Sequence, residues 1–222
     1  MKPTEKLGEA TAPDGTVLAL YRHDGAYTIR AGGVELMSTR RHASEDRLAA
    51  LVCAPLRGTP AARVLVGGLG LGFTLRAALR ELGADARVVV AELVPEVVAW
   101  NREPSYGLAG EALADPRTEL READVADVLR AEPGSFDGIM LDVDNGAEAL
   151  TTAANAGLYG RAGIRLAAGA LRRGGRLAYW AADEARDFEA ALRRASLVVE
   201  VERVRAHGKG GPWHTLLVAR VP

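Results

Sequence analysis

Three glycines and one glutamate are spaced as a binding site for a nucleoside-containing ligand requires. The glycines are Gly68, Gly70 and Gly72. They follow the apolar run 63–67, and Glu92 lies twenty residues beyond the last of them, at the end of a second apolar run, 87–92. Glycine lacks a Cβ and tolerates positive φ, so a ligand can approach such a turn closely. A carboxylate at the tip of the next parallel strand is within reach of a ribose, and at a strand tip we expect it to be dispensable for folding.

The glycine spacing discriminates between nucleotide ligands. It is G-x-G-x-G, whereas the dinucleotide fingerprint G-x-G-x-x-G would need a third glycine at Phe73 or Leu75. No Gly-Lys-Ser/Thr follows, which excludes a P-loop. A tight turn without a cradle for a diphosphate favours a ligand without phosphates, S-adenosylmethionine first among them. The alternative is an ordinary glycine-rich turn between a strand and a helix.

Two further acids follow another buried strand. The run 136–142 is apolar and ends in Asp142, and Asp144 continues the loop. Parallel α/β sheets bind ligands beyond the carboxyl ends of their strands, so Asp142 is expected beside the reacting atoms.

An alternation of strand and helix must position these residues. We expect strands at 63–67, 87–92, 118–121, 136–142 and 176–181, and helices at 73–82, 95–102, 125–131, about 160–172 and 185–195. Gly174 and Gly175 are expected to close the fourth helix. Two last apolar runs, 198–204 and 214–219, should form an antiparallel hairpin at the sheet edge. The pattern predicts an α/β fold with a Rossmann-like, seven-stranded, mostly parallel methyltransferase sheet.

The first 43 residues have a different pattern. Residues 1–15 are expected to be a loose leader, and short β-type runs follow at 17–21, 27–29 and 34–37, separated by turn-forming pairs such as Asp24-Gly25. We therefore divide the chain into a leader with a small β appendage (1–43) and a ligand-binding Rossmann-like domain (44–222). Ser44 is the expected N-cap of the first helix of that domain.

Composition narrows the class of protein. The net charge of −1 over 222 residues argues against a nucleic-acid binder that works through a general basic field. Cys53 is alone, which excludes disulfides and thiolate clusters, and no other spacing indicates a metal site. With neither a signal peptide nor a membrane-length apolar run, we expect a cytoplasmic protein that does not bind membranes.

The segment 63–76, RVLVGGLGLGFTLR, resembles the spermidine synthase-like branch of the class I S-adenosylmethionine-dependent methyltransferase superfamily. The resemblance covers roughly residues 30–220. It implies that Glu92 accepts from the ribose, that Asp124 accepts from the adenine amino group, and that the backbone N–H of Val125 meets the ring. It also implies that Asp142 takes a proton from an attacking amine, and that the protein is a homodimer. Leu93 is placed to lie against the adenine face, and Asp124 is equally expected to cap helix 125–131.

Two departures from that branch bear on the reaction. Leu71 stands where the branch has an aspartate that binds the amine end of decarboxylated S-adenosylmethionine. The loop after Asp142 also has fewer acidic residues than the corresponding loop of that branch. Both changes favour S-adenosylmethionine as donor and methyl transfer to a small amine-type acceptor. The alternatives are a polyamine aminopropyltransferase that uses the decarboxylated donor, and a non-catalytic binding or assembly module. Tyr159, Trp180 and Trp213 are candidates to line the acceptor pocket, but a core position is the stronger expectation for all three. His214 is expected to be structural.

Overall fold

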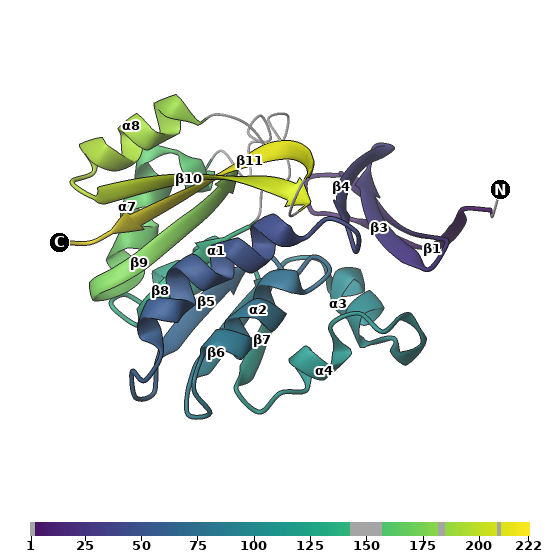
Figure 1. The fold of residues 1–222 in the computed structure, drawn as a ribbon, viewed down its shortest axis with the longest axis horizontal. Helices are drawn as coiled ribbons and strands as arrows, with labels where there is room; N and C mark the ends of the chain where they lie inside the picture. Colours follow the sequence, from purple (N-terminus) through teal and green to yellow (C-terminus); the bar gives the residue numbers. More distant parts are fainter. Residues whose placement is uncertain (1–2, 143–156, 182–184, 208–209) are drawn as a thin grey trace.

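A seven-stranded sheet forms the centre of the molecule (Figure 1). The structure is a computed structural model that describes residues 3–142, 157–181, 185–207 and 210–222. The strand order is β10-β11-β9-β8-β5-β6-β7. The bounds are β5 Arg63–Gly67, β6 Arg87–Glu92, β7 Thr118–Glu122, β8 Phe136–Leu141, β9 Leu171–Ala181, β10 Val198–His207 and β11 Gly210–Arg220. β5 to β9 run parallel, while β10 and β11 form the antiparallel edge hairpin, as predicted.

Helices cover both faces of this sheet because side chains alternate along its buried strands. On β5, Val64 and Val66 join one apolar cluster and Leu65 joins the other. The first cluster includes residues of α1 (Ala43–Cys53), α2 (Phe73–Glu81), α3 (Pro95–Arg102) and α4 (Gly110–Leu113). The second includes residues of α5 (Val125–Ala131), α7 (Arg161–Ala170) and α8 (Arg186–Arg194). The result is a three-layer sandwich, and within the described ranges every helix is too short or too polar to cross a bilayer.

A second, four-stranded antiparallel sheet precedes the sandwich, and Figure 1 shows it to one side. Its strands are β1 Glu5–Thr11, β2 Val17–His23, β3 Ala26–Ala31 and β4 Val34–Ser38, in that order. Three of them confirm the predicted β-type runs, but the expected leader is wrong for residues 5–11. That segment is polar and mostly exposed, so it carries no alternating signal, and pairing with β2 makes it a strand.

Two predicted helix boundaries are wrong. Ser44 is not the N-cap of α1: His42 occupies that position without a side-chain cap, and Ser44 is buried inside the first turn. Gly174 and Gly175 do not close α7, which ends at Ala170; they lie within β9, where Gly174 has a φ of +77°.

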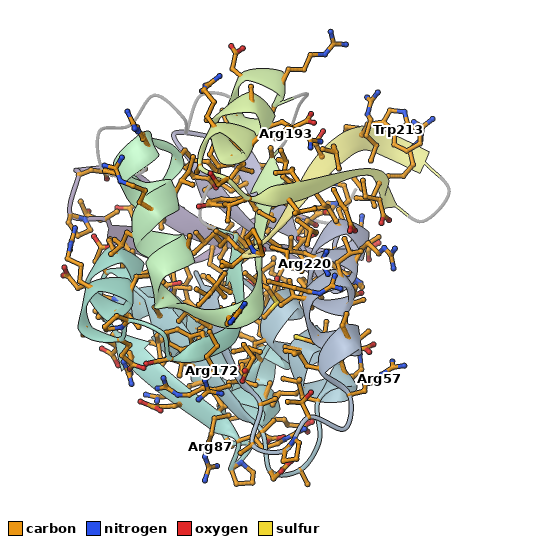
Figure 2. All side chains as sticks on the ribbon, turned by 90° about the vertical axis from the view of Figure 1, so that its left-hand side faces the viewer. Arg57, Arg87, Arg172, Arg193, Trp213 and Arg220 are labelled. Carbon is orange, nitrogen blue, oxygen red and sulfur yellow. The ribbon has the colours of Figure 1, made fainter. Side chains whose placement is uncertain are left out.

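The aromatic residues divide between core and surface. Tyr159 and Trp180 are buried, as predicted. Trp213 is 43% exposed on the edge hairpin, at the periphery of the molecule (Figure 2), so its predicted core position is wrong. The guanidinium of Arg205 lies 4.1 Å from the centroid of the Trp213 ring. This cation–π contact stabilises the exposed ring at the surface.

Candidate functional site

The glycine turn between β5 and α2 has the backbone that the sequence predicts. Gly68, Gly70 and Gly72 have φ values of +87°, +53° and +76°, a region that other residues rarely adopt. A Cβ on Gly72 would overlap that of Ala109, and a Cβ on Gly70 would lie 2.6 Å from Met37 Sδ. The backbone conformation favours glycine at both positions, and at Gly72 the rigid Cβ of Ala109 also leaves no space for a side chain, whereas the flexible end of Met37 can move away from Gly70.

Asn101 in α3 holds this turn in place. The side chain is 1% exposed; its Nδ2 donates to the carbonyl of Gly70 at 2.8 Å, and its Oδ1 accepts from the amide of Ala109 at 3.2 Å. Sequence reasoning missed this residue. The signal was a polar residue inside an otherwise apolar helix face, next to Val97, Val98 and Trp100.

Glu92 is more deeply built into the turn than a strand-tip acid would be. It ends β6 and is 8% exposed. One carboxylate oxygen accepts from the amide of Leu69 and the other from the amide of Val94, both at 2.9 Å. Burial raises the pKa of this carboxyl, and the backbone hydrogen bonds oppose that shift. The expectation that Glu92 is dispensable for folding therefore does not fit its contacts, because it ties the ends of two strands together.

The remaining residues expected near an adenine ring lie at the ends of β6 and β7. Leu93 directly follows Glu92, and its side chain is 42% exposed although apolar. Asp124 is exposed and caps α5, accepting from the amide of Ala126 at 2.8 Å, so its predicted capping role is confirmed. Val125 is buried at the first position of that helix.

Asp142 lies where β8 ends beside the glycine turn. Its backbone amide donates to the carbonyl of Gly67 at 3.1 Å, and its carboxylate accepts from the Thr74 hydroxyl at 3.1 Å. Burial raises the pKa of Asp142 to about 6, against the lowering effect of the Thr74 hydrogen bond. Such a group can exchange a proton near neutral pH. Asp144, the second predicted acid, lies outside the described residues.

Glu45, in the first turn of α1, adds a second acid that the sequence analysis did not include among the site residues. Burial and, after it, the negative charge of Asp142 raise the pKa of Glu45 to about 7. The Ser44 hydroxyl, 2.5 Å from Glu45 Oε2, and the nearby His42 oppose this rise. Glu45 and Asp142 are 97 positions apart in the sequence, so no local pattern could pair them.

His214 and Ser44 connect this acid to the edge hairpin. His214 Nδ1 lies 3.0 Å from Ser44 Oγ, and its ring packs edge-on against Trp180 with centroids 4.7 Å apart. The ring contact follows from register, since Trp180 pairs with Leu216, two residues from His214 on the same strand face. His214 thus packs as the sequence predicts for a structural residue. Its ring also contacts Ser44, which is bonded to Glu45.

Leu71 is 2% exposed and belongs to the apolar cluster under α1 and α2. The turn therefore offers no carboxylate at this position. Among the described residues, no group of three histidine, cysteine, aspartate or glutamate side chains is arranged to hold a metal ion.

No protein-family model and no curated protein matches this sequence, but solved structures share its fold. A spermidine synthase in complex with the transition-state analogue AdoDATO has a TM-score of 0.77 at 18% identity, covering 98% of this chain and 74% of that one. The spermidine synthase of Thermotoga maritima has a TM-score of 0.73 at 18% identity, with coverages of 98% and 72%.

A methyltransferase also shares the fold. The 1,6-didemethyltoxoflavin-N1-methyltransferase of Burkholderia thailandensis, with S-adenosylhomocysteine bound, has a TM-score of 0.58 at 21% identity, with coverages of 81% and 79%. The chain therefore has the class I methyltransferase fold, and the resemblance to the spermidine synthase-like branch is confirmed at the level of the fold.

Proposed function

We propose that this protein is an S-adenosylmethionine-dependent transferase that alkylates a small amine. The observation that carries the proposal is the position of Asp142. Its backbone is bonded to Gly67 at the start of the glycine turn, and its carboxylate is bonded to Thr74 just after that turn. An acid so placed adjoins any ligand that the turn binds, at the sheet edge where ligands of parallel α/β folds bind.

The described residues fit the donor. The Glu92 carboxylate accepts from the amides of Leu69 and Val94, one on each oxygen, and the amides of Gly70 and Leu93 also face it. Because a carboxylate has about four acceptor sites, we propose that it also accepts from the ribose hydroxyls of the donor. Leu93 offers an exposed apolar side chain against which an adenine ring would pack. Asp124, while capping α5 through one oxygen, retains acceptor capacity for the adenine amino group.

The chemistry requires little from the protein beyond positioning. When bound, the donor supplies an electrophilic carbon on a positively charged sulfur. Holding an amine in line with that carbon lowers the barrier by several kcal/mol, about 7–11 in the best intramolecular cases. Asp142 orients the amine through its N–H groups and accepts the proton that the alkylated nitrogen releases.

We further propose that the transferred group is methyl. Leu71 is buried and apolar, so the glycine turn carries no negative charge at this position that would disfavour the carboxylate of S-adenosylmethionine. Aminopropyl transfer from the decarboxylated donor is the second candidate, favoured by the two spermidine synthase structures that this chain matches over 98% of its length. The third candidate is a non-catalytic binding or assembly module, which would not need a carboxylate at position 142.

Donor binding followed by product analysis separates the three candidates. Titration calorimetry of the purified protein with S-adenosylmethionine and with its decarboxylated form should show that the former binds at least as tightly. Incubation with each donor and a panel of primary amines, read by mass spectrometry, should show a gain of one methyl group on one of the amines. A more than tenfold preference for the decarboxylated donor would overturn methyl transfer, and binding without any alkylated product would indicate a module.

A further inference from the structure

Trp180 has an indole N–H that lacks a hydrogen-bond acceptor. The residue is 6% exposed and lies near the end of β9. Its Nε1 is buried and has no hydrogen-bond partner among the residues that the structure describes. A buried donor without an acceptor is destabilising, and such groups are few in native proteins, so each of them requires an explanation. The place of Trp180 in the sheet supplies one.

The strand register places Trp180 beside Asp142. β8 and β9 are parallel neighbours in which Leu141 pairs with Tyr179. The residues that follow these two, Asp142 and Trp180, therefore lie side by side. Leu141 and Tyr179 belong to the apolar cluster under α7 and α8. Because side chains alternate along a strand, the next residue of each strand points to the other face, toward α1 and α2. Trp180 accordingly packs in the cluster of that face, and Thr74 of α2 is bonded to Asp142.

Trp180 lies on the side of Asp142 that faces away from the donor. β8 has β5 as its neighbour on one side and β9 on the other. The glycine turn, where we propose that the donor binds, follows β5. The donor thus takes one side of Asp142, and the side of β9 is left to the acceptor. His214 packs edge-on against the Trp180 ring, with centroids 4.7 Å apart, and holds the indole in a fixed orientation.

We propose that Trp180 binds the acceptor, and that its indole N–H donates to a neutral oxygen, a hydroxyl or a carbonyl, on the same molecule as the reacting amine. The inference rests on the proposed alkylation of an amine. An alkylammonium group has only donors and would leave the indole N–H unpaired, which argues against a diamine. A carboxylate could accept from the indole, but the ionised carboxylate of Asp142 beside it would repel it. The acceptor class that remains is an amino alcohol or an amine that carries a carbonyl group.

The test compares acceptors of equal length that differ at one end. Straight-chain amino alcohols of increasing length are assayed with S-adenosylmethionine, each beside the alkylamine and the diamine with the same number of heavy atoms. In the wild type, kcat/KM for the best amino alcohol should exceed that of its alkylamine and its diamine by about 10- to 100-fold, because only the hydroxyl accepts from the buried N–H.

Trp180→Phe separates binding of the oxygen from packing. The variant loses the N–H and keeps an aromatic ring, so the difference between the amino alcohol and the alkylamine should disappear. A purely structural role of Trp180 would lower kcat/KM for both amines alike and keep that difference. Trp213→Phe is the matched control, since it makes the same substitution at an exposed position of the edge hairpin and should keep the wild-type difference.

A second measurement does not depend on turnover. The chain has three tryptophans, so a ¹H–¹⁵N spectrum contains three indole N–H signals, and the two variants identify that of Trp180. With S-adenosylhomocysteine present, the best amino alcohol should move the proton of this signal downfield, as a new hydrogen bond does. The matched alkylamine should not.

Three results would overturn the proposal: a preference for the diamine, a preference for the amino alcohol that survives in Trp180→Phe, or an indole signal that no amino alcohol moves. The first of these would indicate that the face of the ring, and not its N–H, binds a cation. A shifted indole signal without any alkylated product would reject the proposed function and leave Trp180 as a residue that binds an oxygen.

Discussion

The Thr74 hydroxyl donates to the carboxylate of Asp142 at 3.1 Å and so joins the first turn of α2 to the end of β8. The contact follows from topology. β5 and β8 are parallel neighbours in which Gly67 pairs with Leu141, so the residues that follow each strand emerge side by side. The acid is thereby fixed against the glycine turn, which gives the site a clear set of mutational tests.

Asp142→Asn should lower turnover about 10²–10⁴-fold, because the amide keeps the shape of the side chain but cannot accept a proton. The affinity for S-adenosylhomocysteine should change little, since the backbone bond to Gly67 is unaffected. Turnover, calorimetric affinity and melting temperature measured on one preparation decide the matter. Near-normal turnover would exclude Asp142 as the base.

Glu45→Gln should make the protein more stable at alkaline pH. The folded protein holds the pKa of Glu45 at about 7, above its ordinary value of 4.5, so folding favours the protonated acid. Wild-type stability therefore falls as the pH rises from about 4.5 to about 7, and the variant escapes that loss. We expect a gain on the order of 1–3 kcal/mol at pH 8 that vanishes near pH 4.5. Urea unfolding at both pH values measures it, and a variant less stable than the wild type at pH 8 contradicts the buried acid pair.

Glu92→Ala should weaken both the fold and the binding of the donor. The backbone amides of Leu69 and Val94 lose their acceptor, which costs about 1–3 kcal/mol for each group left unsatisfied. Binding of S-adenosylmethionine should weaken by about 1.5–3 kcal/mol, the scale of hydrogen bonds to a charged group. Denaturation and calorimetry separate the two effects. A folded variant with unchanged affinity rules out the ribose contact.

Gly72→Ala should destabilise the protein more than Gly107→Ala does. Both glycines have positive φ, +76° and +60°, so a Cβ strains the backbone at either position, at a cost of about 1–2 kcal/mol. Only at Gly72 would the Cβ also overlap Ala109, whereas nothing lies within 4 Å at Gly107. Equal losses in the two variants would show that the close approach between the turn and α4 is absent.

Much of the sandwich could be predicted from local pattern. β5, β6, α3 and α5 begin and end at or within a residue of the expected positions, because buried parallel strands are continuous apolar runs and the turns between them carry glycine. The positive φ values at Gly68, Gly70 and Gly72 were implied by residue type alone, and so was the capping role of Asp124. These features depend on residues within a few positions of one another.

The electrostatics of the site depend instead on tertiary packing. Glu45 becomes a partner of Asp142 only because α1 packs against α2 and β8, and His214 reaches Ser44 only because β11 returns antiparallel beside β9. The sequence by itself determined the sheet, the glycine turn and the acid at its edge, since each is encoded in a short segment. The depth of Glu92, the strand β1 and the pKa values of the acid pair were decided by tertiary structure, because burial and charge proximity arise only when distant segments exclude water together.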